Sequence, residues 1–234
     1  MKKFFLDTKA TLGLVSDKTV DEDYEKRSAG LKTLHDATSS YQSSMEKVKH
    51  AGKEFVKALE EASKAFEKLN ADDHIPSELK QYSKEFKEMV EKIQKGALLQ
   101  FTKEMDAKVI TSGSSLKGDC EACSHLEQER SKAVNEYDVY RDTVSKKEAE
   151  YAKKGKNLKD SKGYEEEVKQ RDHFKSVYET ANKSFKEKHD ELLKKLVENN
   201  KACAKEFADC TTTFLKDLSK EMERLEKASS GFAK

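Results

Sequence analysis

Mainly apolar residues in the first third of the chain recur at alternating intervals of three and four positions. The stripe comprises Leu31, Leu34, Thr38, Tyr41, Met45, Val48, Gly52, Phe55, Leu59, Ala62, Phe66 and Leu69. The intervals are those of the a and d positions of a heptad, continued over more than five heptads, which favours coiled-coil packing over an isolated surface helix. We therefore predict a first long helix over about residues 20–70.

A turn signal ends this pattern, and two further apolar patterns follow. Asn70, Asp72 and Asp73 favour a turn, the only proline is Pro76, and Ser77 begins the second pattern. The second pattern comprises Leu79, Tyr82, Phe86, Met89, Ile93, Ala97, Phe101 and Met105, then Leu116, Cys120, Cys123, Val134, Tyr137, Val144 and Tyr151. The third comprises Val168, Phe174, Tyr178, Ala181, Phe185, Leu192, Leu196, Cys203, Phe207, Cys210, Phe214, Leu218, Met222 and Leu225. They predict helices over about residues 77–154 and 164–228.

The predicted helices differ from those of a compact bundle in their length. They contain about 50, 75 and 65 residues, and at ~1.5 Å per residue the second spans on the order of 110 Å. We expect an all-α protein in which the second and third helices form an extended antiparallel arm and the first covers part of it. The stretch TSGSSLKG, residues 111–118, carries Gly113 and Gly118. Each glycine costs a helix roughly 1 kcal/mol relative to alanine, so a kink or break is expected there.

The charge of the chain is balanced overall but concentrated at one place. Forty-six Lys and Arg face forty-five Asp and Glu, a net charge of +1. Residues 146–162, around the turn between the second and third helices, have a local net charge of +4. Its lysines are Lys146, Lys147, Lys153, Lys154, Lys156, Lys159 and Lys162. They form either a binding surface for an anionic partner or a solvated loop rich in lysine.

Patterns typical of enzymes, cofactors and nucleic-acid binding are missing from the sequence. There is no GxxxxGK[ST] loop and no HExxH, and the six histidines are scattered without ligand spacing. Binding to nucleic acid calls for a strongly basic chain or interleaved aromatic residues. The four cysteines are expected to be partly buried, unreactive thiols rather than a zinc site. We therefore expect no catalytic site, no cofactor and no bound metal.

The N-terminal residues 1–16 form a short amphipathic leader. Phe4, Phe5, Thr8, Leu12 and Val15 fall on one helical face, with lysines toward the others. Two interpretations remain for Phe4 and Phe5: they insert into a membrane interface, or they pack on the helices of the same protein. Because the leader lacks the apolar core of a signal peptide, and no apolar run approaches the ~20 residues of a membrane span, we expect a cytosolic protein.

Two stretches of the sequence resemble the BAR domain of amphiphysins and endophilins. In residues 12–27, Leu12-Gly13, Thr19, Asp21-Glu22 and Tyr24 are similar to the start of that family's first helix. In residues 131–141, Lys132, Tyr137, Asp138 and Arg141 are similar to a stretch of its second helix. The resemblance covers about residues 3–228, and residues 17–234 are interpreted as the domain.

The resemblance implies a crescent-shaped homodimer that binds anionic phospholipid membranes and senses or induces their curvature in endocytosis or vesicle traffic. It implies tips formed by the lysine-rich turn, a concave face with Arg130, Lys132 and Arg141, and a dimer core with Phe55 and Leu59. A peripheral location on the plasma membrane or endosomes follows. Two of these assignments have an alternative. The three basic residues of the concave face could instead belong to a salt-bridged helix surface. The apolar residues of the first helix could instead form only a core within the chain.

The competing function is a structural coiled-coil scaffold that binds other proteins and never touches lipid. The position of the positive charge separates the two hypotheses. A scaffold has no need for lysines at the end of a hairpin, whereas a membrane-binding crescent does.

Overall fold

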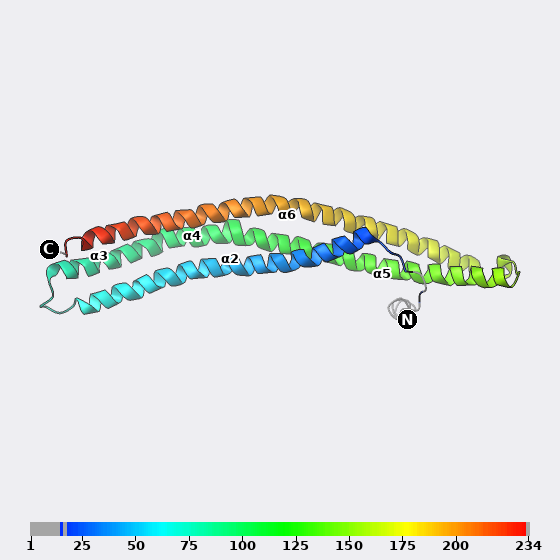
Figure 1. Ribbon diagram of the computed structural model, residues 1–234, viewed down its shortest axis with the longest axis horizontal. Coiled ribbons are helices and arrows are strands. Elements are labelled where there is room, and N and C mark those ends of the chain that lie inside the picture. Colours follow the sequence, from blue (N-terminus) through cyan, green and yellow to red (C-terminus); the bar gives the residue numbers. More distant parts are fainter. Residues whose placement is uncertain (1–14, 16–17, 233–234) are drawn as a thin grey trace. The chain divides into compact units, whose positions relative to one another are not determined.

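In the computed structural model, the described residues are Val15 and residues 18–232, and they are almost entirely helical (Figure 1). The elements are α2 (Glu22–Leu69), α3 (Ser77–Ile93), the π-helix η1 (Gln94–Leu98), α4 (Leu99–Glu104), the π-helix η2 (Met105–Ile110), α5 (Thr111–Lys153), the 3-10 helix η3 (Leu158–Asp160) and α6 (Tyr164–Ser229). No strand occurs among these residues. The expectation of an all-α protein is therefore confirmed.

The helix ends follow from local chemistry. Asp21 caps α2, because its side-chain Oδ1 accepts a hydrogen bond from the backbone N–H of Tyr24 at 3.0 Å. Pro76 directly precedes α3. At this position a backbone N–H would have no partner within the helix, so the N–H that proline lacks costs no hydrogen bond. Three helical segments were expected at about residues 20–70, 77–154 and 164–228; the observed helical stretches are 22–69, 77–153 and 164–229.

The chain divides into two compact units, and each long helical stretch contributes to both. Unit 1 comprises the described residues up to Asp36 together with Gly118–Lys195; unit 2 comprises Ala37–Lys117 and the described residues from Leu196. In unit 2, parts of α2, α3, α4, η2 and α6 surround one apolar core. Its buried members are Val56, Phe86, Met89, Val90, Ile93, Phe101, Met105, Val109, Ile110, Cys210, Phe214, Leu218 and Leu225. In unit 1 the largest fully buried side chains include Leu31, Val144, Phe185 and Leu192.

The break expected at residues 111–118 is wrong. Helix α5 continues through Gly113 and Gly118. A Cβ at Gly113 would lie only 3.0 Å from two ring atoms of Tyr41. Gly113 therefore lets the Tyr41 ring approach the helix closely, which is a packing role rather than a helix-breaking one.

The observed irregularities precede that stretch. The helix widens into π geometry at Gln94–Leu98 and again at Met105–Ile110. At the second site, the Thr111 hydroxyl donates to the backbone carbonyl of Asp106 at 2.6 Å. Each π-turn inserts an additional residue and so rotates the side chains that follow. Within the second one, the neighbouring residues Val109 and Ile110 are both buried in the core of unit 2.

Gly52 on α2 makes the closest approach, and it provides a stability prediction. A Cβ there would lie 2.9 Å from the Phe101 ring, which is itself stacked on Phe214 at 4.5 Å between centroids. We expect Gly52→Ala to destabilise the protein by about 1–3 kcal/mol through overpacking.

The same substitution at Gly30, also on α2, should stabilise the protein by up to about 1 kcal/mol, because nothing lies within 4 Å of a Cβ there. Urea denaturation of both variants measures the two effects. A stabilising Gly52→Ala would contradict the packing of Phe101.

Candidate functional site

The lysine-rich turn is a well-defined hairpin between α5 and α6. Gly155 has φ +62° and Gly163 has φ +84°, the left-handed region that glycine adopts without a Cβ clash. The N–H groups of Gly155 and Lys156 donate to the carbonyls of Ala152 and Tyr151 at 3.1 and 3.0 Å, which closes the end of α5 as a Schellman motif. This hairpin belongs wholly to unit 1.

Polar contacts fix the rest of the turn. The Asn157 side chain accepts from the backbone N–H of Lys159 at 3.0 Å and so caps η3. The Tyr164 hydroxyl donates to Glu148 Oε1 at 2.5 Å, which joins the first turn of α6 to the end of α5. This hydrogen bond also raises the pKa of Tyr164 above its ordinary value. The lysines are therefore carried on a structured turn.

The seven lysines predicted for the tip fall into two groups. Three are paired with carboxylates: Lys146 with Asp142 at 2.6 Å, Lys147 with Glu167 at 2.5 Å, and Lys154 with Glu150. The other four are exposed and form no ion pair with any residue that the structure describes; they are Lys153, Lys156, Lys159 and Lys162. These four are hereafter called the free tip lysines. Together with the exposed carboxylate of Asp160, they set the net positive charge of the turn.

Arg130 is buried, and its assignment to a lipid-facing concave surface is wrong. It is 3% exposed, its guanidinium stacks 3.6 Å from the Tyr24 ring centroid, and its Nη2 lies 3.4 Å from Asp21 Oδ2. It also donates to Asn182 Oδ1 at 3.3 Å and to the Tyr178 hydroxyl at 3.4 Å. A side chain with its donors turned inward in this way cannot reach a bilayer.

The other two predicted concave residues lie in different surroundings. Lys132 is exposed on α5. Arg141 is half-buried, with Nη2 3.0 Å from Asp138 Oδ1 and Nη1 donating to the Thr19 hydroxyl at 3.2 Å. The three residues therefore do not form one basic cluster, and the role of Lys132 in lipid binding stays a prediction.

The residues that resemble the family's first helix hold the start of α2 against α5 and α6 of unit 1. Thr19 donates to Asp138 twice, from its N–H at 2.9 Å and from its hydroxyl at 2.6 Å. Nearby, Arg27 pairs with Asp190 at 2.5 Å and donates to His189 Nδ1 at 3.2 Å. Burial, together with the charge of Arg27, lowers the pKa of His189. Sequence reasoning found the motif but not these partners, which are more than 100 residues away in the chain.

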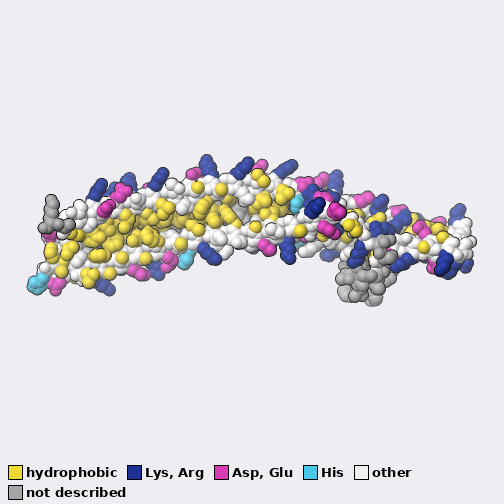
Figure 2. Space-filling model, in the orientation of Figure 1, with side chains coloured by type: hydrophobic (Ala, Val, Ile, Leu, Met, Phe, Trp, Pro, Cys, Tyr) yellow, Lys and Arg dark blue, Asp and Glu magenta, His cyan; other side chains and the backbone are white. Residues whose placement is uncertain are grey.

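The predicted dimer residues Phe55 and Leu59 lie on a part of α2 with two apolar seams. Val56 is fully buried in the core of unit 2, whereas Phe55 is 51% exposed and Leu59 is partly buried. Other large apolar side chains of unit 2 are also exposed: Phe66, Leu69, Leu99, Val197, Leu215, Met222 and Phe232. Figure 2 shows hydrophobic side chains gathered where α2, α3 and α6 lie in Figure 1. We call this the open apolar face of unit 2.

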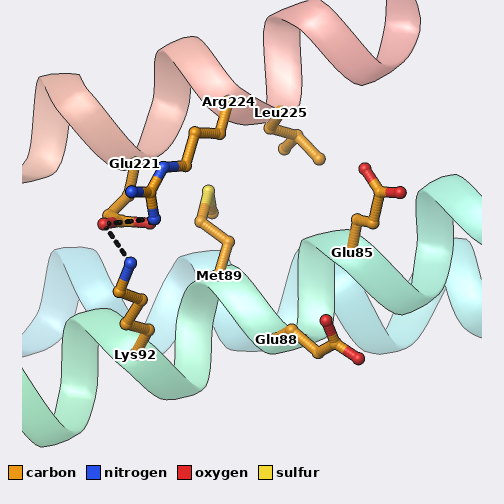
Figure 3. Close-up of a pocket in the computed structure, with 7 residues that line it drawn as sticks. All are labelled: Glu85, Glu88, Met89, Lys92, Glu221, Arg224 and Leu225. Carbon is orange, nitrogen blue, oxygen red and sulfur yellow. Dashed lines mark hydrogen bonds and ion pairs between the residues drawn. The ribbon is translucent and has the colours of Figure 1, made fainter.

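A pocket of about 330 Å³ lies between α3 and α6 of unit 2 (Figure 3). Met89 and Leu225 form its apolar part, and Glu221 pairs with Lys92 at 2.8 Å and with Arg224 at 2.7 Å. Burial opposes ionisation of Glu221, but the hydrogen bonds from the two cations prevail and its pKa is lowered. The buried carboxylate is thus an ion-paired link between α3 and α6 and is not poised as a general base.

The four cysteines are free, buried thiols. Cys120 and Cys123 belong to unit 1, and Cys203 and Cys210 to unit 2. Burial raises the pKa of Cys123 to about 11, which disfavours the reactive thiolate. No cluster of metal-ligating side chains occurs within the described residues.

No helix in the part of the chain that the structure describes is long and apolar enough to cross a membrane. Phe4 and Phe5, predicted to insert into a membrane, lie outside the described residues, and their role stays a prediction.

Comparison of the chain with protein-family models and with curated proteins finds no match.

Proposed function

We propose that this chain is a BAR-like module that binds anionic bilayers as a homodimer and senses or induces membrane curvature. The observation that carries the proposal is the hairpin between α5 and α6, where four lysines without ion-pair partners among the described residues project from a structured turn. The motifs in residues 12–27 and 131–141 support the family assignment, because their residues join the start of α2 to α5.

The magnitude of the tip charge explains why a dimer is part of the proposal. A lysine near an anionic leaflet contributes about 1 kcal/mol, so four free tip lysines contribute on the order of 4 kcal/mol. That energy corresponds to roughly millimolar affinity for one tip. Two tips on one rigid particle bind with a higher effective concentration, which raises the avidity. The open apolar face of unit 2 is the surface that we assign to the contact between the two copies.

In this proposal the protein is not an enzyme, carries no cofactor, and acts on the cytoplasmic side of the plasma membrane or of endosomes in vesicle traffic. The dimer is a crescent built from three-helix coiled-coil arms. Lys132 remains a candidate membrane contact, whereas Arg130 has a structural role.

Sedimentation with liposomes tests the proposal. The wild-type protein should pellet with vesicles that contain phosphatidylserine and stay in the supernatant with phosphatidylcholine alone. Binding should weaken as added salt shortens the Debye length. Equal pelleting with both vesicles, or none with either, would reject the proposal and favour the coiled-coil scaffold, for which the open apolar face of unit 2 would bind another protein.

A further inference from the structure

A groove on α5 begins where the N-terminal leader ends. It has a volume of about 360 Å³ and is lined by Val15, Val139, Asp142, Thr143, Lys146, Lys147 and Glu150. Val15 and Val139 are both buried against each other and form its apolar start. The groove lies within unit 1.

The charged residues of the groove are largely paired with one another or with α6. Lys146 is bound to Asp142 and Lys147 to Glu167, at 2.6 and 2.5 Å. The Asp142 side chain is only 10% exposed. When their ammonium groups are held in this way, the lysine stems present methylene groups, which are suitable walls for an aromatic ring.

The leader matches this groove in length, and the apolar face of the leader is the one that carries Val15. Residues 1–14 lie outside the described residues, and they lead directly to Val15. The sequence places Phe4, Phe5, Thr8 and Leu12 on one helical face with Val15. As a helix, residues 4–15 span about 16 Å, and the groove follows α5 from Val139 to Glu150, an equal number of residues and hence the same length.

We infer that, in the absence of lipid, the leader of the same chain packs along this groove with Phe4 and Phe5 toward its Lys147–Glu150 end. Val15, which is already seated on Val139, sets the position of the leader. This inference rests on the physical fit of the leader and the groove. It does not depend on the proposed function, since it concerns the protein without a membrane.

Lysine acylation followed by mass spectrometry tests the packing in lipid-free solution. We compare the wild type with a Phe4→Ser, Phe5→Ser variant and with a Lys2→Ser, Lys3→Ser variant that keeps both rings. Lys146 and Lys147 should react at least about tenfold faster in the first variant, because each of the two lost apolar contacts contributes a factor of about ten or more. The second variant should resemble the wild type. Lys132, exposed on the same helix, should react equally in all three proteins.

Three results would overturn the inference. Equal labelling of Lys146 and Lys147 in the wild type and the Phe variant means that the groove is empty of the leader. A parallel increase at Lys132 means general loosening of the helix. Loss of protection on dilution of the wild type means that the leader of a second copy fills the groove. Because no lipid is present, each outcome is independent of the liposome result that tests the proposed function.

Discussion

Replacing Phe55 with glutamate should convert the proposed homodimer into monomers that keep their helix content. Phe55 is half exposed in the single chain, so its loss leaves the core of unit 2 around Val56 intact. In a two-fold symmetric dimer each substitution occurs twice. Two lost apolar contacts of about 1.5–3 kcal/mol each, with two carboxylates left unpaired at the contact, predict a dimer weakened by at least about 100-fold.

Sedimentation equilibrium at micromolar concentration measures this effect, with circular dichroism to verify folding. Lys53→Glu, two residues earlier on α2 and exposed, is the matched control and should remain dimeric. Leu59→Glu is a poorer test, because Leu59 packs on the core of its own chain and its replacement would destabilise the monomer too. A monomeric wild type would reject the dimer, and a dimeric Phe55→Glu variant would place its contact elsewhere.

Replacing Arg130 with alanine should be among the most destabilising single changes in the chain. The substitution removes a buried guanidinium that touches Tyr24, Tyr178 and Asp21. Breaking such a buried pair costs about 3–5 kcal/mol. For a chain of this length, that loss lowers the Tm by on the order of 10 °C.

Lys132→Ala, on the exposed surface of the same helix, is the control and should change stability by no more than about 0.5 kcal/mol. Thermal unfolding followed by circular dichroism compares the two variants. If Arg130→Ala melts like the wild type and loses only liposome binding, Arg130 is a lipid contact after all and the buried arrangement is wrong.

The apolar periodicity predicted the helical segments well because it depends on nearest neighbours along the chain. Turn chemistry at Pro76, Gly155 and Gly163 is equally local. Periodicity does not specify which seam of a helix is covered. The predicted stripe on α2 includes Phe55 and Leu69, which are exposed, whereas the buried Val56 lies beside that stripe.

The errors arose where distant residues determine the outcome. Gly113 was read as a helix breaker because its partner, the Tyr41 ring, is 72 residues away. Arg130 was assigned to the concave face from the resemblance, whereas the partners that bury it, Tyr24 and Tyr178, come from two other helices. For the tip, the sequence predicts seven lysines, and only the structure separates the paired residues from the free ones.

The central claim is that the hairpin tip attaches the protein to anionic membranes. It is tested most directly by comparing two variants that reverse the same number of charges at different places on the protein. One variant changes the four free tip lysines, Lys153, Lys156, Lys159 and Lys162, to glutamate. The other changes four exposed lysines of unit 2 that have no ion-pair partner among the described residues: Lys103, Lys201, Lys205 and Lys220. The net charge of both variants is the same, so overall attraction to the membrane changes equally.

Both variants must first show wild-type helix content and the same oligomeric state. Pelleting with phosphatidylserine vesicles is then measured at one ionic strength. The tip variant should lose nearly all binding, since about 4 kcal/mol of attraction per tip becomes repulsion, while the unit 2 variant should keep most of its binding. If the tip variant pellets as well as the wild type, or if both variants lose binding equally, the tip is not the membrane-binding site.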